Sequence, residues 1–95
     1  MAQRQQPSTS VKHQNFVKEP MGNKPVDHLP GIGQVTSARM NERNITQASQ
    51  VYGKYLVENR NHAAFENWMK NDFNVSSKRA GQCLNAVDSY YKQFN

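Results

Sequence analysis

Apolar residues recur at intervals of three and four along most of this chain, which is the spacing that places them on one face of an α-helix. The clearest repeat lies near the C-terminus and comprises Ala80, Cys83, Leu84, Val87, Tyr91 and Phe94. Two earlier repeats comprise Ala48, Val51, Tyr52 and Tyr55, and then Phe65, Trp68, Met69 and Phe73. No segment alternates with period two, so no β-strand is predicted. The pattern therefore predicts an all-α fold.

Capping residues and prolines divide this pattern into five to six short helices. Ser, Thr and Asn favour the N-cap position, and the residue before a proline is pushed out of the helical region. The first expected helix covers residues 11–17, with Ser10 as its N-cap, and Pro20 stops it. At most one turn is expected over 25–29 with Pro25 in its first position, followed by a helix over 34–43 and a helix over 46–59 capped by Thr46. Asn61 caps the next helix, and Ser76 or Ser77 caps the last one. Asn44 is expected to end its helix in the left-handed conformation, with Ile45 packing back on that helix.

The first nine residues, MAQRQQPST, differ from the rest because they contain nothing to bury. Ordering them would cost conformational entropy without compensation. We expect a flexible tail over residues 1–9 and one domain over 10–95. A chain of 95 residues has a thin core unless a partner covers part of its surface, which predicts a dimer.

The turn at Gly31-Ile32-Gly33 is the most informative segment. It follows Leu29-Pro30 and precedes a helix, so the order is helix, glycine hairpin, helix. We expect positive φ on both sides of Ile32, which would fill the core and leave a bare backbone that can approach a phosphate. A plain connection between two helices is an equally open interpretation, because a lone Gly-x-Gly is weak evidence.

The helix that follows this hairpin is expected to present its positive end to an anion. Its first N–H groups belong to Gly33, Gln34 and Val35, and Arg39 lies about one and a half turns later. Contacts of this kind touch the phosphate backbone and not the base edges. They predict DNA binding that is independent of sequence and strongly dependent on salt.

A second helix start repeats this character at Ser76-Ser77-Lys78-Arg79. Basic residues in the first turn oppose the helix dipole, so a bound anion explains them better than helix stability does. Lys12 shares this position in the first helix. The sequence therefore predicts that three helix starts converge on one phosphate track.

The charge balance agrees with a polyanionic partner without proving one. Twelve Lys and Arg against seven Asp and Glu give a net charge of +5, which fits a DNA-binding protein and also fits an ordinary basic surface. The seven carboxylates are dispersed singly, and the three histidines show no ligand spacing. We expect no enzyme, no metal and no cofactor.

The remaining chemistry predicts a soluble intracellular protein. Cys83 is the only cysteine, so no internal disulfide can form, and its place on an apolar stripe is typical of a core residue. No secretory signal and no apolar run of membrane-spanning length is present, so direct membrane insertion is not expected.

Two features have both a structural and a functional interpretation. Gly53 interrupts an amphipathic helix, either because another helix approaches closely or as a tolerated weak position. The aromatic residues at helical spacing could stack on nucleobases, but core or interface packing is the more common outcome.

The chain resembles the barrier-to-autointegration factor family over essentially all of residues 8–94. The matching stretches are Lys12-His13 with Phe16-Val17, Glu19-Pro20-Met21-Gly22 with Lys24-Pro25-Val26, Gly31-Ile32-Gly33, Gly53 with Leu56-Val57, and Phe65 with Trp68. The resemblance implies a SAM-like compact bundle with a helix-hairpin-helix motif. It further implies a homodimer that bridges double-stranded DNA in chromatin organisation and nuclear envelope assembly, in the nucleus and also the cytoplasm. The implied partners are LEM-domain proteins, lamin and histones.

The resemblance also assigns roles to residues. The implied DNA contacts are Lys12, Gly31, Gly33, Val35, Arg39, Ser76, Lys78 and Arg79. Gly53 would lie at the dimer interface, and Val57, Ala64 and Trp68 would line the groove for the LEM domain. Phosphorylation would fall on Ser8, Thr9 and Ser10, where added negative charge would repel DNA held by Lys12.

Several positions depart from the family pattern and leave a second function open. Gln14 and Gly81 stand where the family is usually basic, and Ala64 replaces a bulkier groove residue. The alternative is a helical dimeric protein-interaction module, an adaptor for LEM-domain or chromatin proteins, with weak or lost DNA binding.

Overall fold

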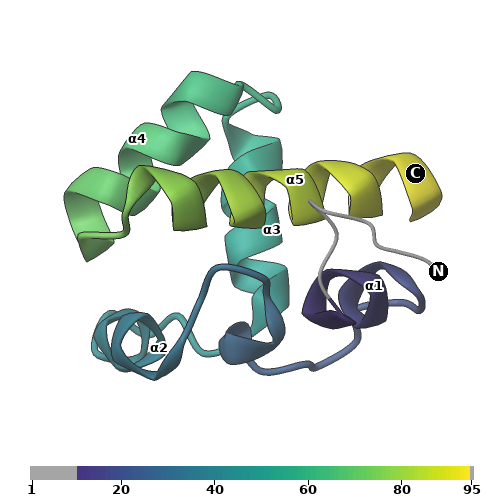
Figure 1. Cartoon of the computed structure of the whole chain (residues 1–95), viewed down its shortest axis with the longest axis horizontal. Coiled ribbons are helices and arrows are strands. Elements are labelled where there is room, and N and C mark those ends of the chain that lie inside the picture. The colour runs from purple at the N-terminus through teal and green to yellow at the C-terminus, as the bar shows by residue number, and fades with distance from the viewer. Residues whose placement is uncertain (1–10, 95) are drawn as a thin grey trace, which may run out of the picture.

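Six helical segments make up the computed structural model of this chain, which describes residues 11–94 (Figure 1). The segments are α1 (Val11–Val17), the single 3-10 turn η1 (Val26–His28), α2 (Gln34–Asn41), α3 (Ala48–Val57), α4 (His62–Phe73) and α5 (Ser77–Phe94). Within this part of the chain there is no strand, only one isolated antiparallel bridge between Pro25 and Gln47. The prediction of an all-α fold is confirmed.

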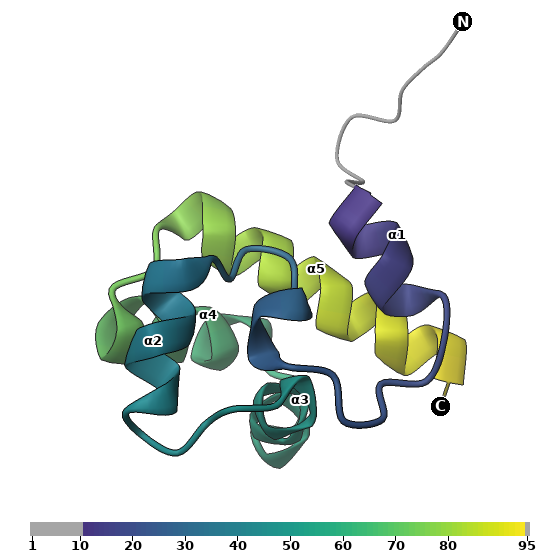
Figure 2. The ribbon, with the colours of Figure 1, turned by 90° about the horizontal axis from the view of Figure 1, so that it is seen from below.

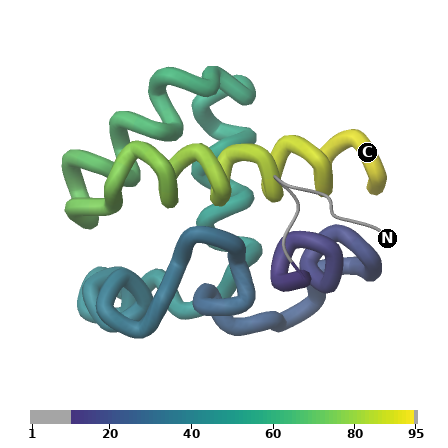
Figure 3. The backbone as a smooth tube through the Cα atoms, viewed as in Figure 1, coloured from purple at the N-terminus to yellow at the C-terminus, as the bar shows by residue number. Residues whose placement is uncertain are grey.

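The long helix α5 is the element around which the others are arranged. In Figures 1 and 3 it lies across α3, with α4 on one side and α1, η1 and α2 on the other. Figure 2 shows α3 end-on, with α2 and η1 beside it. Contacts of α4 and α1 with α5 are the most extensive between elements. The periodic apolar stripe of α5 therefore faces two helices at once.

The core lies between these helices and contains three of the four phenylalanines of the sequence. Tyr55, Phe16, Phe65, Phe73 and Leu29 are each less than 2% exposed. Burying one such side chain contributes roughly 2 kcal/mol. Rings from α1, α3, α4 and α5 meet there, so the core ties together helices far apart in the sequence.

Several expected helix ends are confirmed by hydrogen bonds. The Asn61 side chain accepts from the Ala64 N–H at 2.9 Å, and the Ser76 hydroxyl accepts from the Arg79 N–H at 3.2 Å. Asn44 has φ 65°, and the N–H of Ile45 donates to the carbonyl of Met40 at 2.9 Å. Asn61 and Ser76 thus begin helices for the capping reasons inferred from their types, and Asn44 has the expected left-handed conformation in the turn after α2.

Other helix boundaries differ from the prediction. The N-cap of α3 is Gln47 and not Thr46, because the Gln50 side chain accepts from the N–H groups of both residues, at 2.8 Å from Thr46 and 3.0 Å from Gln47. Helix α2 ends at Asn41 and α3 ends at Val57, each two residues earlier than expected. Pro25 occupies the N-cap of η1 and not its first helical position. The expected cap Ser10 lies outside the described residues.

The buried face of α5 also differs near its end. Tyr90, absent from the predicted stripe, is 9% exposed, whereas Tyr91 is half-buried and Phe94 is 37% exposed. The Tyr90 hydroxyl accepts a hydrogen bond from the Met21 N–H at 2.9 Å. This bond to the loop after α1 turns Tyr90 inward, so Tyr90 takes the core position that the spacing assigned to Tyr91.

Candidate nucleic-acid interface

The glycine hairpin connects η1 to α2 and has a different backbone at its two glycines. Gly31 has φ 85°, whereas Gly33 is the extended N-cap of α2 with φ −98°. The expectation of positive φ on both sides is therefore wrong for Gly33, because an N-cap residue adopts an extended conformation. Ile32 is 1% exposed and fills the core as expected.

Gly31 lies directly against the backbone of α5. A Cβ atom at Gly31 would overlap the carbonyl oxygen of Arg79 and lie 3.3 Å from the backbone nitrogen of Cys83. A Cβ at Gly33 would lie 3.3 Å from Nη1 of Arg79. The glycines thus serve a close approach between the hairpin and α5, in addition to any approach to a phosphate.

The starts of α2 and α5 share one surface hollow, here called the helix-start hollow. Its lining residues are Gly33, Gln34, Val35, Thr36, Arg39, Asn74, Val75, Ser76 and Arg79. Five of the predicted DNA contacts, from segments about forty residues apart in the sequence, therefore line one surface. Each helix start presents N–H groups and the positive end of a dipole.

Lys12 joins this surface from α1 through a second hollow, here called the hairpin hollow. Lys12, Pro30, Gly31, Ile32, Gly33, Arg79 and Gln82 line it. The Lys12 Nζ atom donates to the carbonyl oxygen of Ile32 at 2.8 Å, and burial lowers the pKa of Lys12. Arg79 lines both hollows and connects them, which sequence reasoning did not anticipate.

The charges at this surface are all of one sign. Arg39, Arg79 and Lys12 line the two hollows, and no carboxylate of the described residues does. Lys78 is exposed in the first turn of α5 but lines neither hollow. Sequence reasoning considered only the backbone N–H of Gln34 and missed Gln82, because a side-chain amide gives no charge signal. The arrangement can bind a row of phosphates.

The residues assigned to the dimer interface and the partner groove lie on other helix faces, on α3 and α4. Val57 is 76% exposed, whereas Ala64 and Trp68 are half-buried. The Nζ atom of Lys54 lies 5.6 Å from the centroid of the Trp68 ring. No described atom would lie within 4 Å of a Cβ at Gly53. Of the two interpretations of Gly53, the close approach of another helix is thus not found among the described residues of one chain.

Other chemistry is sparse in the part of the chain that the structure describes. No group of three or more His, Cys, Asp or Glu residues there could hold a metal ion. Cys83 is fully buried, and burial raises the pKa of its thiol to about 12. None of the described helices has the length and hydropathy needed to cross a bilayer. Ser8, Thr9 and Ser10, the expected phosphorylation sites, lie outside the described residues.

Comparisons with known proteins agree on one family. A family model described as barrier to autointegration factor matches residues 7–94. The chain is 42% identical over 86 residues to the barrier-to-autointegration factor of Drosophila melanogaster, covering 90% of this chain and 96% of that protein. It is 38% identical over 87 residues to the factor of Mus musculus and 36% identical to that of Homo sapiens, with 92% of this chain and 98% of each relative covered.

Proposed function

Because the chain belongs to the barrier-to-autointegration factor family, which is not a family of enzymes, we propose that it binds double-stranded DNA without sequence preference. A homodimer holds one duplex on each subunit and so bridges DNA, in chromatin organisation and nuclear envelope assembly. The implied location is the nucleus, at chromatin and the nuclear envelope, and also the cytoplasm.

The helix-start hollow is the observation that supports this proposal most directly. It combines the positive ends of two helices with Arg39 and Arg79, and no carboxylate lines it. Backbone N–H groups and guanidinium groups bind phosphate oxygens without reading base edges. The contacts available here therefore favour binding that depends on charge and helix geometry and not on sequence.

A mobility-shift series over salt concentration tests DNA binding. The logarithm of the affinity for an arbitrary duplex should fall linearly with the logarithm of salt, and Lys78→Gln should make that slope less steep by about 1. Lys18→Gln is the matched control, because Lys18 is also exposed but follows the last residue of α1 and so belongs to none of the helix starts. Absence of binding at low salt would overturn the proposal.

Dimerisation converts a phosphate-binding surface into a bridge between duplexes. Leu56 and Val57 are exposed apolar residues on α3, 39% and 76% exposed, and Gly53 on the same helix leaves room for a close neighbour. These features support a subunit contact along α3. Sedimentation with and without duplex DNA tests it, since bridging predicts complexes that contain two duplexes per dimer.

The partners that the family suggests are LEM-domain proteins, lamin and histones. We place the LEM-domain groove at Val57, Ala64 and Trp68, and the exposed Val57 beside the half-buried Ala64 and Trp68 supports a protein ligand with an apolar surface. Phosphorylation of Ser8, Thr9 or Ser10 would reduce DNA binding by repulsion. If the dimer captures a LEM domain but binds no duplex at low salt, the protein is the interaction module considered as the alternative.

A further inference from the structure

Arg39 of α2 and Arg43, which lies two residues after the end of α2, bind the last carbonyl groups of α4. Arg39 Nη1 donates to the carbonyl oxygen of Phe73 at 3.0 Å, and Arg43 Nη1 donates to that of Asp72 at 3.4 Å. Arg39 lies in the last turn of α2, and Arg43 lies in the turn that follows this helix. The last carbonyls of a helix have no partner within it, so these arginines satisfy acceptors that would otherwise need water.

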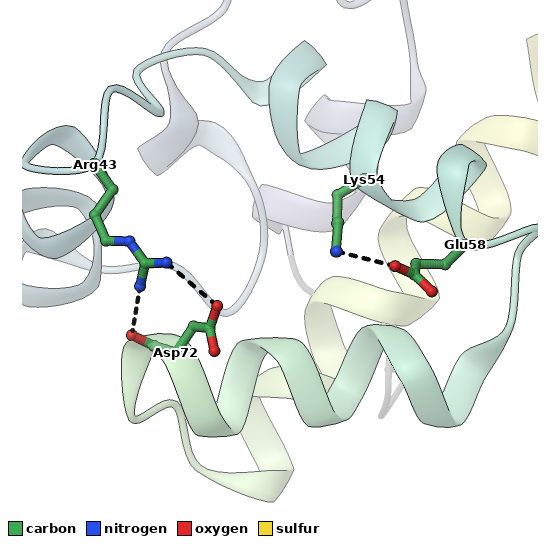
Figure 4. A network of polar contacts seen from close by, with 4 residues as sticks. All are labelled: Arg43, Lys54, Glu58 and Asp72. Atoms are coloured by element: carbon green, nitrogen blue, oxygen red, sulfur yellow. Dashed lines mark hydrogen bonds and ion pairs between the residues drawn. The ribbon is translucent and has the colours of Figure 1, made fainter.

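Arg43 makes two further contacts with the same helix end. Its Nη2 atom lies 3.4 Å from Oδ2 of Asp72 (Figure 4). Its guanidinium carbon lies 5.0 Å from the centroid of the Phe73 ring. The Arg43 side chain thus contacts the carbonyl and the carboxylate of Asp72 and the ring of Phe73. Figure 4 also shows a contrasting pair, Lys54 and Glu58, whose 2.9 Å contact lies within α3 and joins no two elements.

This contact fixes the end of α2 that lies away from the DNA-binding surface. The start of α2 is fixed by the hairpin, where Gly31 packs against the backbone of α5. Thr36 and Met40 bury the middle of the helix. Because Arg43, just after α2, binds the end of α4, the eight-residue helix has a tertiary contact at each end.

The end of α4 leads directly into the start of α5. Phe73 is the last residue of α4, and only Asn74, Val75 and Ser76 separate it from α5. Through its contacts with Asp72 and Phe73, Arg43 therefore connects α2 to the turn that contains Ser76. Their relative position sets the separation of the two helix starts.

We propose that Arg43 is a positioning residue that, through Asp72 and Phe73, holds the starts of α2 and α5 at the spacing a duplex backbone requires. This inference rests on the proposed DNA binding. Arg43 need not contact DNA, and Asp72 contributes to DNA binding although its charge repels phosphate.

The sign of the Asp72 effect separates positioning from simple electrostatics. Removing an acidic charge near a polyanion should tighten binding if charge alone matters. If Asp72 acts by holding Arg43, Asp72→Asn should instead weaken duplex binding, by about two- to fivefold for a surface ion pair. Arg43→Lys should also weaken binding, because lysine keeps the charge but loses the fork of donors.

The matched control is Glu42→Gln. Glu42 is the exposed C-cap of α2, next to Arg43, and it forms no ion pair among the described residues. Its substitution removes the same charge from the same region without loosening α2, so binding should be unchanged or slightly tighter. Glu58→Gln should behave likewise, because the Lys54–Glu58 pair joins no two elements. If Asp72→Asn binds as tightly as Glu42→Gln does, the positioning role is overturned.

A measurement without DNA keeps the two proposals distinguishable. Amide hydrogen exchange should accelerate in Asp72→Asn at the Val75 N–H, which is bonded to Met69, and at the Ser37 N–H, which is bonded to Gly33. The Phe65 N–H, bonded to Asn61 at the far end of α4, serves as the internal reference. Absence of duplex binding by the unmodified protein overturns the proposed function, whereas unchanged exchange at Val75 and Ser37 overturns the role of Arg43.

Discussion

At the scale of single residues, Gly31 is constrained both by its backbone and by its surroundings. Its φ of 85° lies in the left-handed region, and α5 passes so close that a Cβ would overlap the carbonyl oxygen of Arg79. Gly22 shares the positive φ, at 52°, but has open space around it. Comparing substitutions at the two glycines therefore separates the free-energy cost of a left-handed backbone from the cost of the steric overlap with α5.

We expect Gly31→Ala to destabilise the protein by more than about 3 kcal/mol, since strain and overlap combine. Gly22→Ala should cost only about 1 kcal/mol, the cost of a left-handed conformation for a residue with a Cβ. Urea unfolding followed by circular dichroism measures both. Equal losses in the two variants would show that the contact with α5 adds nothing.

Asp88 is a second residue whose surroundings predict a measurable effect. The Tyr55 hydroxyl donates to Oδ1 of Asp88 at 2.7 Å, and Lys92 lies 3.0 Å from Oδ2. The hydrogen bond from Tyr55 is the main cause that lowers the pKa of Asp88. Burial raises the pKa of Tyr55 to about 12, so its hydroxyl remains a donor over the physiological range.

A carboxylate whose pKa is lowered by folding stabilises the protein above its unfolded pKa and loses that contribution as the pH falls through its folded pKa. Asp88→Asn should therefore reduce the free energy of unfolding at neutral pH by about 1–2 kcal/mol, and the deficit should shrink below about pH 4. Urea unfolding at pH 7, 4 and 3 checks this. A deficit that stays constant over that range would argue against the ionised Asp88 as its source.

At the scale of elements, Ser76 caps the start of α5 and is also one of the proposed DNA contacts. Ser76→Ala should cost about 1 kcal/mol of stability, because the Arg79 N–H loses its acceptor. Ser77→Ala should cost less than about 0.5 kcal/mol, since Ser77 is an exposed residue of the first turn. Thermal unfolding of both variants checks the difference, and a larger loss in Ser77→Ala would place the cap one residue later.

The elements that sequence predicted well are those specified by local chemistry. The stripe of α5 as far as Val87, the caps Asn61 and Ser76 and the turn residue Asn44 follow from spacing and residue type within one turn of helix. The cap at Gln47 escaped prediction because glutamine is an unusual N-cap residue, and its bond to Gln50 replaces the usual serine or threonine.

Contacts between distant segments could not be predicted from local pattern. Arg43 and Asp72 are 29 residues apart and meet only because α2 packs beside the end of α4. The connection of both hollows by Arg79 depends on another such contact, the close approach of the hairpin to α5. The sequence thus indicated most of the residues of the candidate site, while their mutual support came from the tertiary arrangement.

At the scale of the whole molecule, Gly53 tests the proposed dimer. Gly53→Ala should stabilise the subunit by up to about 1 kcal/mol, because alanine favours helix and no described atom lies near the added Cβ. Gly53→Met should leave the helical circular dichroism unchanged but shift the protein to monomer in sedimentation velocity. If Gly53→Met dimerises like the unmodified chain, the subunit contact lies elsewhere.

The single tryptophan gives this molecule an intrinsic optical reporter. Trp68 is half-buried beneath Lys54, and its ring meets that of Phe73 edge-on at 5.2 Å between centroids. A protein that covers the groove should exclude water from the indole and move its fluorescence emission to shorter wavelength. Duplex DNA at the helix-start hollow should leave the wavelength of the fluorescence emission maximum nearly constant, because Trp68 does not line that hollow. The unlabelled protein can therefore indicate which of its surfaces is occupied.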